Sequence, residues 1–248
     1  MLFEIFFAYR TAKKNLEACQ GVRQLDPMTQ AYLRGNYEQA MALTTDPFMQ
    51  AEMFIQLGRI PEAEQILRRM AETITEPKPL TLVTSQLGNI LMLQQRYDEA
   101  MDCYQRALRL WPERGSTYRA IAEWHLRRAD NSAEALRWAR LAIEKEKAGG
   151  VSQDSKDLCL AEDLSTLAWA VAVHSQDGAE VDRLCEQIAF PAMTPVCSLA
   201  MSSFQFGKAW AAVGDTAQST AHFDAAIQRD PRGVWAREAA AQRATNPA

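Results

Sequence analysis

A short helical phrase recurs along the chain, and its spacing limits the fold more than any other feature. The phrases YEQAM, PEAEQ, YDEAM and SAEAL each follow a turn or break signal and carry the alanines Ala40, Ala63, Ala100 and Ala135. A phrase that returns every few tens of residues is typical of a repeat array, whose units bury their apolar faces against one another. The sequence therefore predicts stacked copies of one small unit.

Two distant segments share more than this phrase. Leu87-Gly88, Ala100, Tyr104, Ala107 and Pro112 align without a gap to Phe206-Gly207, Ser219, Phe223, Ala226 and Pro231, always 119 residues later. The steps of three, four and seven residues place the small and large apolar positions on one helix face. We expect Gly88, Ala122 and Gly207 at close helix crossings, where a larger side chain would push the axes apart. Tyr104 and Leu108 are expected to fill the groove against the next helix pair.

Turn and cap signals divide the chain into helices. Asp26-Pro27 and Asp46-Pro47 each combine an N-cap residue with a proline at the first helical position. Gly35-Asn36 and Gly58 are typical of tight turns between paired helices. Ala, Leu, Glu, Gln and Arg, which favour helices, dominate the composition, and no run alternates as a strand would. These signals predict an all-α protein.

The pattern resembles the tetratricopeptide repeat, a helix–turn–helix unit of about 34 residues. The best match is the unit 81–114, which has the Leu-Gly pair, the alanine, the aromatic residue and the closing proline, although Thr84 and Leu91 replace the tryptophan and tyrosine of the first helix. The resemblance implies a right-handed α-solenoid of stacked antiparallel helix pairs. It also implies a concave surface, lined by the first helix of each pair, that binds protein partners.

The matches divide the chain into five parts. They are an N-terminal helix at 1–20, short degenerate helix pairs at 21–80, the two best-formed units at 81–148, a loop plus degenerate repeat at 149–195, and a C-terminal unit with a capping helix at 196–248. The polar stretch 144–156 predicts a loop after Gly149-Gly150. The apolar stretch Asp157–Ser175 predicts a helix buried within the array. The prolines of 190–195 predict a linker.

The first residues allow two interpretations. Leu2, Phe3, Phe6, Phe7 and Tyr9 fit a first helix packed on the array, which is the preferred one; together with Arg10, Lys13 and Lys14 they also fit a helix lying in a membrane interface. The segment lacks the pattern of a signal peptide or of a membrane span. The cysteines number five, an odd count without any Cys-x-x-Cys pair, which favours a reducing compartment. We expect a cytoplasmic protein, with peripheral membrane association as the lesser alternative.

The sequence offers little to support catalysis. His125, His174 and His222 lie about 50 residues apart in different units, without the close spacing of a zinc site. No nucleotide-binding glycine motif occurs, and no histidine is near Cys185 or Cys197 in sequence to activate a thiol. The net charge of −4 does not suggest nucleic-acid binding. We therefore expect a protein that is not an enzyme, with no cofactor or metal and no nucleic-acid partner.

The expected function is a non-catalytic scaffold or adaptor that binds a partner segment in the concave groove. Asn89, Arg119, Glu123 and Arg127 are the candidate peptide-binding residues, because an amide can bond a peptide backbone and arginines can hold carboxylates. Ser85, Met92, Phe204 and Lys208 are further lining candidates. Glu123 favours a mixed-charge or partly apolar segment. The alternatives are an accessory chaperone for secretion or membrane-complex assembly and, third, an enzyme of unrecognised type.

Two further observations bear on the partner. One subgroup of the family grips the acidic tails of heat-shock chaperones with a lysine–asparagine–arginine clamp. Ser85, Ala120 and Thr166 stand at three of the clamp positions, so that partner is not expected. Residues 106–147 carry ten Lys or Arg against six Asp or Glu, and residues 148–200 carry two against eight. This asymmetry is interpreted as a solvated surface, or else as a means of steering a polar partner.

Overall fold

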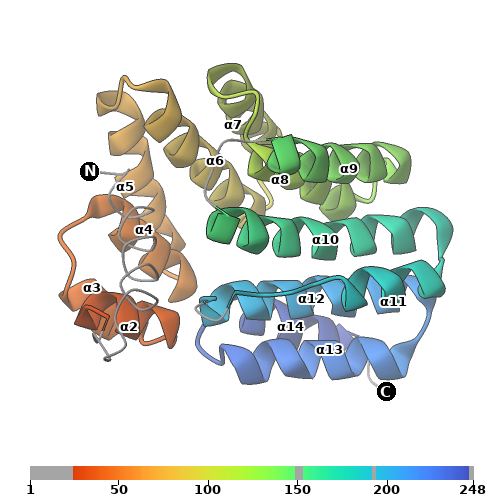
Figure 1. The fold of residues 1–248 in the computed structure, drawn as a ribbon. Helices are drawn as coiled ribbons and strands as arrows, with labels where there is room; N and C mark the ends of the chain where they lie inside the picture. Colours follow the sequence, from red (N-terminus) through yellow and green to blue (C-terminus); the bar gives the residue numbers. More distant parts are fainter. Residues whose placement is uncertain (1–24, 149–152, 192–193, 246–248) are drawn as a thin grey trace.

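In a computed structural model of the protein, the described residues are 25–148, 153–191 and 194–245, and they form helices without any strand (Figure 1). The helices are α2 (Pro27–Leu33), α3 (Tyr37–Ala42), α4 (Pro47–Gln56), α5 (Ile60–Thr73), α6 (Pro77–Leu93), α7 (Tyr97–Leu110), α8 (Gly115–Arg128), α9 (Ser132–Ala148), α10 (Gln153–Ser175), α11 (Gly178–Glu186), α12 (Val196–Val213), α13 (Thr216–Arg229) and α14 (Val234–Thr245). Consecutive helices pack as antiparallel pairs, and the pairs stack side by side. The predicted all-α solenoid is confirmed.

The helix boundaries follow the cap and turn residues. A carboxylate oxygen of Asp26 accepts a hydrogen bond of 2.9 Å from the backbone N–H of Thr29, and Asp46 caps α4 in the same way. These bonds satisfy backbone donors that have no partner inside the helix. Gly35 and Gly58 adopt φ values of +73° and +76°, which glycine reaches without steric cost. The short pairs at the start of the chain therefore end where the sequence predicts.

Gly88 and Gly207 lie at the closest approach within their helix pairs. A Cβ atom at Gly88 would stand 2.5 Å from the ring of Tyr104, and one at Gly207 would stand 2.5 Å from the ring of Phe223. Ala122 is fully buried. The Tyr104 ring therefore fills the space within its own helix pair, and its hydroxyl donates to Asn89 Oδ1 at 3.0 Å. Tyr104 also belongs to the same buried cluster as Ala120, Ile121 and Trp124 of α8, which agrees with the prediction that it packs toward the next pair.

The middle of the chain is more helical than the sequence indicates. Helix α10 begins at Gln153, within the stretch predicted as a loop up to residue 156. It packs against α9 on one side and α12 on the other, which buries its apolar faces inside the array (Figure 1). The segment between α11 and α12 contains no helix in its described residues, as its prolines predict.

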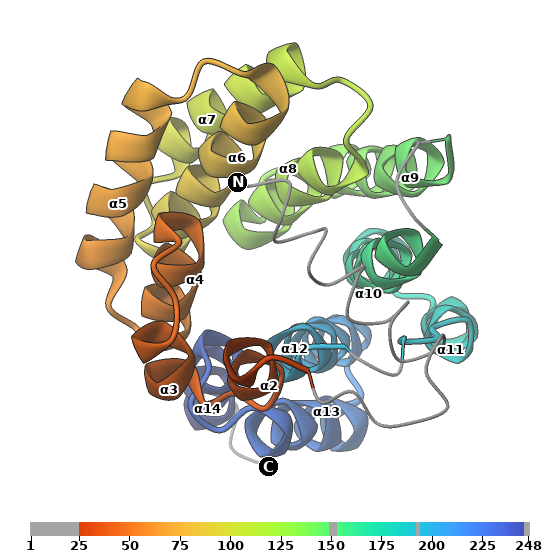
Figure 2. The ribbon, with the colours of Figure 1, turned by 60° about the vertical axis from the view of Figure 1, so that its left-hand side comes forward.

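The array curves so far that its first and last parts meet (Figure 2). The Tyr37 hydroxyl bonds the carboxylate of Asp230, and both residues are buried. Arg237 Nη2 donates to the carbonyl oxygen of Gln56 at 2.8 Å, and Arg232 Nη2 donates to Asn36 Oδ1 at 2.6 Å. Helix α14, expected to cap the C-terminal end, thus joins the N-terminal pairs and closes a ring.

The predicted helix or membrane anchor at 1–20 lies outside the described residues. Within the part of the chain that the structure describes, no helix combines the length and apolar character needed to cross a bilayer.

Candidate functional site

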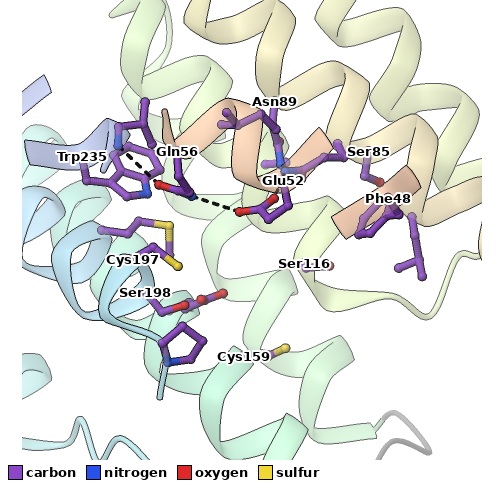
Figure 3. A pocket seen from close by; sticks show the side chains of 18 of the residues that line it. Phe48, Glu52, Gln56, Ser85, Asn89, Ser116, Cys159, Cys197, Ser198 and Trp235 are labelled. Atoms are coloured by element: carbon purple, nitrogen blue, oxygen red, sulfur yellow. Dashed lines mark hydrogen bonds between the residues drawn. The ribbon is translucent and has the colours of Figure 1, made fainter. Parts of the chain in front are cut away.

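The ring encloses a cavity of about 560 Å³ on its inner surface (Figure 3). Side chains from α2, α4, α6, α8, α10, α12 and α14 line it, so the first helix of each pair faces inward and α14 completes the wall. Apolar side chains make up much of this wall: Met28, Phe48, Met49, Leu82, Met92, Leu158, Met201 and Trp235. Four of these are methionines, whose flexible thioether chains adapt to differently shaped ligands.

Asn89 lies on this wall, as do Ser85 and Met92. The Asn89 side chain is exposed, and its Nδ2 donates to Gln86 Oε1 at 3.0 Å while its oxygen accepts from Tyr104. These bonds fix the orientation of the amide and leave one of its two N–H groups for a ligand.

Phe204 and Lys208, predicted as lining residues, are not among the side chains of the cavity wall. Phe204 is only 2% exposed and packs beside Trp235 with a centroid distance of 5.5 Å. Lys208 Nζ donates to Gln242 Oε1 at 2.9 Å. Helix α14 covers this part of the inner surface, and no pattern in the sequence indicated this placement.

Arg119 and Glu123 also line the cavity, and both are held by side chains of this protein. Arg119 Nη2 donates to Glu162 Oε2 at 2.7 Å. Its Nε lies 3.1 Å from Asp163 Oδ1, although the two are not aligned as a hydrogen bond. Glu123 Oε1 accepts from Gln205 Nε2 at 2.9 Å. The basic 106–147 and acidic 148–200 segments thus meet inside the molecule at this point.

Burial dominates the electrostatics of this network. Asp163 is fully buried, and burial raises the pKa of its carboxyl to about 8, against the opposing effect of Arg119. The Arg119 guanidinium keeps its proton, because Glu162 and Asp163 raise its pKa despite burial. The carboxylates that Arg119 contacts belong to this chain, and the sequence alone had not paired them.

Arg127 lines the cavity and bridges α8 to α14. Its Nη1 donates to Glu238 Oε2 at 3.0 Å, and its guanidinium lies over the rings of Trp235 and Phe204 at 5.7 and 5.9 Å. Helical spacing thus brought Asn89, Arg119, Glu123 and Arg127 to one cavity. It did not indicate that each would already have contacts within the protein. Their role in partner binding stays a prediction.

Charged lining residues that sequence reasoning missed include Glu52, Arg114 and Glu162. The Glu52 carboxylate accepts from Gln56 Nε2 at 3.0 Å and from Gln86 Nε2 at 2.6 Å, and burial raises its pKa (Figure 3). The spacing of Glu52 from Met49 and Gln56 places it on the inward face of α4, which is the signal that could have found it. Arg114 lines the cavity at the start of α8, and its Nε is shielded from solvent without a hydrogen-bond partner.

The histidines contribute little to this site. His125 lies beside Asp130, with Nδ1 3.0 Å from Oδ1, and is not part of the cavity wall. His174 lies 3.2 Å from the Ser132 hydroxyl on the outside of the array. Among the described residues, no group of three His, Cys, Asp or Glu side chains is arranged to hold a metal ion.

Comparisons with known proteins agree with this architecture. A family model described as tetratricopeptide repeat matches residues 80–145, which span α6 to α9. The crystal structure of BtubC (BKLC) from P. vanneervenii is similar at a TM-score of 0.50 and 16% identity, over 92% of this chain and 89% of that chain. At this identity the similarity concerns the fold alone. None of the curated proteins compared with the chain matches it. Residues 80–145 thus carry tetratricopeptide repeats, within a helical array that continues on both sides of them.

Proposed function

We propose that the cavity holds a segment of a partner protein and that the chain is a non-catalytic interaction module, a scaffold or adaptor. Tetratricopeptide repeats are in general protein-interaction units. The observation that carries the proposal is the cavity itself, a concave and largely apolar surface with polar side chains at fixed positions. Such a combination gives affinity through apolar contact and orientation through a few polar groups.

The size of the cavity limits what it can hold. A volume of about 560 Å³ falls within the range of about 300–1,000 Å³ typical of sites that bury a small ligand. A whole helix is about 10–12 Å across with its side chains, too wide for a site of this volume. A short extended segment, or a few side chains of a longer one, fits better.

The four predicted residues supply part of the polar surface of the cavity. Asn89 offers its remaining N–H group to a backbone carbonyl oxygen of the segment. Arg119, Glu123 and Arg127 are held in place by their contacts with Glu162, Gln205 and Glu238. Because these side chains are already ordered, contact with a partner costs them little rotamer entropy.

The test blocks the cavity without disturbing the ion pairs. Ser116 lines the cavity, and its hydroxyl makes no hydrogen bond with the described residues. Peptides are selected on the protein from a displayed random library, and their affinity for Ser116→Phe is measured by calorimetry. A loss of about tenfold or more is expected, because the new ring occupies the space of the segment.

The matched control is Gln105→Phe, which adds the same ring to an exposed position of α7. Affinity should be unchanged there. The proposal is contradicted if the selected peptides bind Ser116→Phe and Gln105→Phe equally well. It is also contradicted if the library gives no binder.

A further inference from the structure

We propose that the partner segment carries charges of both signs, with an anionic group beside Arg114, a cationic group beside Glu52 and apolar side chains between them. The inference rests on the proposed function and specifies the chemistry of its partner. It follows from the charged groups of the cavity wall, most of which already have partners in this chain.

Several charged groups of the cavity wall are already paired within this chain. Arg119 is neutralised by Glu162 and also lies beside Asp163, and Arg127 is neutralised by Glu238. Glu123 receives a hydrogen bond from Gln205 and lies 3.6 Å from Arg119. Asp46 is occupied in capping the first turn of α4. Each of these groups therefore gains little from a charged ligand.

Arg114 differs from the other arginines of the wall. Among the described residues it forms no ion pair, and its guanidinium lies over the ring of Trp111 at 5.5 Å. The neighbouring Glu146 influences it electrostatically but does not contact it within ion-pair distance. Burial lowers the pKa of Arg114, since a buried cation without a counter-ion is unfavourable. An anionic group of the segment would supply that counter-ion and could accept two parallel hydrogen bonds from the guanidinium.

Two hydroxyl groups of the cavity wall can also donate to an anionic group. Ser116 and Ser198 also line the cavity, and neither hydroxyl makes a hydrogen bond in the described part of the chain. Hydroxyl groups donate readily to a carboxylate. Figure 3 shows both serines on the wall, together with Cys159.

Glu52 is the anionic group of the wall that corresponds to Arg114. Both of its oxygens accept from side-chain amides, but no cation of the described chain pairs with it. One of those amides, Gln56, also accepts a hydrogen bond of 3.3 Å from the backbone N–H of Val234, so Glu52 is fixed where α4 meets α14 (Figure 3). Burial raises the pKa of Glu52, and no counter-ion of the described chain offsets this effect. A lysine, an arginine or an amino terminus of the segment would provide it.

Together with the apolar wall, Arg114 and Glu52 disfavour a segment whose charges are all of one sign. Phe48, Leu82 and Leu158 present apolar surface. A purely acidic segment would face Glu52 without a counter-charge, and a purely basic one would face Arg114. A segment of mixed charge with an apolar centre satisfies both groups.

The experiment uses synthetic hexapeptides in a positional-scanning array, probed with the labelled full-length protein. The wild type is expected to select an acidic residue at one position and a basic residue at another within the same peptides. Arg114→Gln should lose about tenfold in affinity for the acidic residue while keeping the basic preference, and Glu52→Gln should do the reverse. Arg109→Gln and Glu72→Gln, exposed on α7 and α5, are the matched controls and should change neither preference.

A peptide without the acidic residue distinguishes misfolding of a variant from loss of the charge contact. A peptide with its acidic residue replaced by glutamine should bind Arg114→Gln and the wild type equally. Arg114→Lys, which keeps the charge, should retain part of the acidic preference. Peptides that bind in the cavity without a charge preference, or preferences that Arg114→Gln and Glu52→Gln leave unchanged, would overturn this inference and leave the proposed function standing. If no peptide of the scanning array binds, both this inference and the proposed function are contradicted.

Discussion

Within the helix pairs, Gly88 lies against Tyr104 and Gly207 against Phe223, whereas the ring closes through the Tyr37–Asp230 bond and the contact of Arg237 with the Gln56 carbonyl. The first kind of contact is apolar and occurs twice, 119 residues apart. The second is polar, occurs once, and joins residues 193 positions apart. Repeated contacts build the array, and single contacts decide how far it curves and what it encloses.

The glycine positions should give the largest effect on stability. Gly207→Leu places a side chain where even a Cβ atom would lie 2.5 Å from the Phe223 ring. We expect a loss of about 1–3 kcal/mol in the free energy of unfolding through overpacking, measured by urea denaturation. Gly88→Leu should behave alike, because it stands at the equivalent crossing.

The control for this prediction is Ala211→Leu, at an exposed position of the same helix. It should be close to neutral. A neutral Gly207→Leu would show that the pair contacts are looser than the geometry indicates.

The buried carboxyl of Asp163 should make stability depend on pH. Its pKa is raised from 3.8 to about 8 in the folded protein, so the folded state holds the proton more tightly than the unfolded chain. This contribution is fully present below about pH 4 and is lost as pH rises through about 8. The stability of the wild type relative to Asp163→Asn should therefore fall by more than about 1 kcal/mol across that window, since one pKa unit corresponds to about 1.4 kcal/mol.

Urea denaturation at several pH values measures this difference. Asp102→Asn, at an exposed position of α7, is the control. If the stability of the wild type relative to Asp163→Asn stays constant or increases with pH, the assigned direction of the Asp163 pKa shift is wrong.

Tyr37→Phe tests the ring closure directly. It removes the hydroxyl that bonds Asp230, while the aromatic part of the side chain stays in its buried site. A loss of about 1 kcal/mol is expected, because one buried hydrogen bond disappears. Hydrogen exchange should accelerate in α2 and α3 and stay unchanged in α6 to α9. Uniform acceleration over the chain would mean that ring closure and array form one cooperative unit.

An exposed polar contact should have the smallest effect. Arg128 lies 3.3 Å from Asp98, whose side chain is 97% exposed. Asp98→Asn should change stability by less than about 0.5 kcal/mol, because solvent screens such pairs. Thermal unfolding at low and high salt measures this change. A larger effect would show that polar contacts matter here independently of burial.

The candidate site was predictable in part. Asn89, Arg119, Glu123 and Arg127 follow from helical spacing, since the inward face of each first helix can be read from the repeat. Trp235 was not found, because it reaches the same cavity only after α4 and α14 meet, whereas the spacing of Glu52 on α4 could have indicated its place. The buried state of Phe204 depends on α14 for the same reason.

The sequence by itself determined the helices, their caps and the crossings at Gly88 and Gly207, because these depend on neighbours within one or two units and recur with the repeat. Only the tertiary structure decided that Tyr37 meets Asp230 and that Arg119 meets Glu162. Small rotations between successive pairs add up over the whole array, so the final approach of its two ends is not set by any local pattern. Which buried charge pairs with which then depends on that approach and on the stacking of α10 beside α8, since opposite charges pair only where three-dimensional packing brings them together.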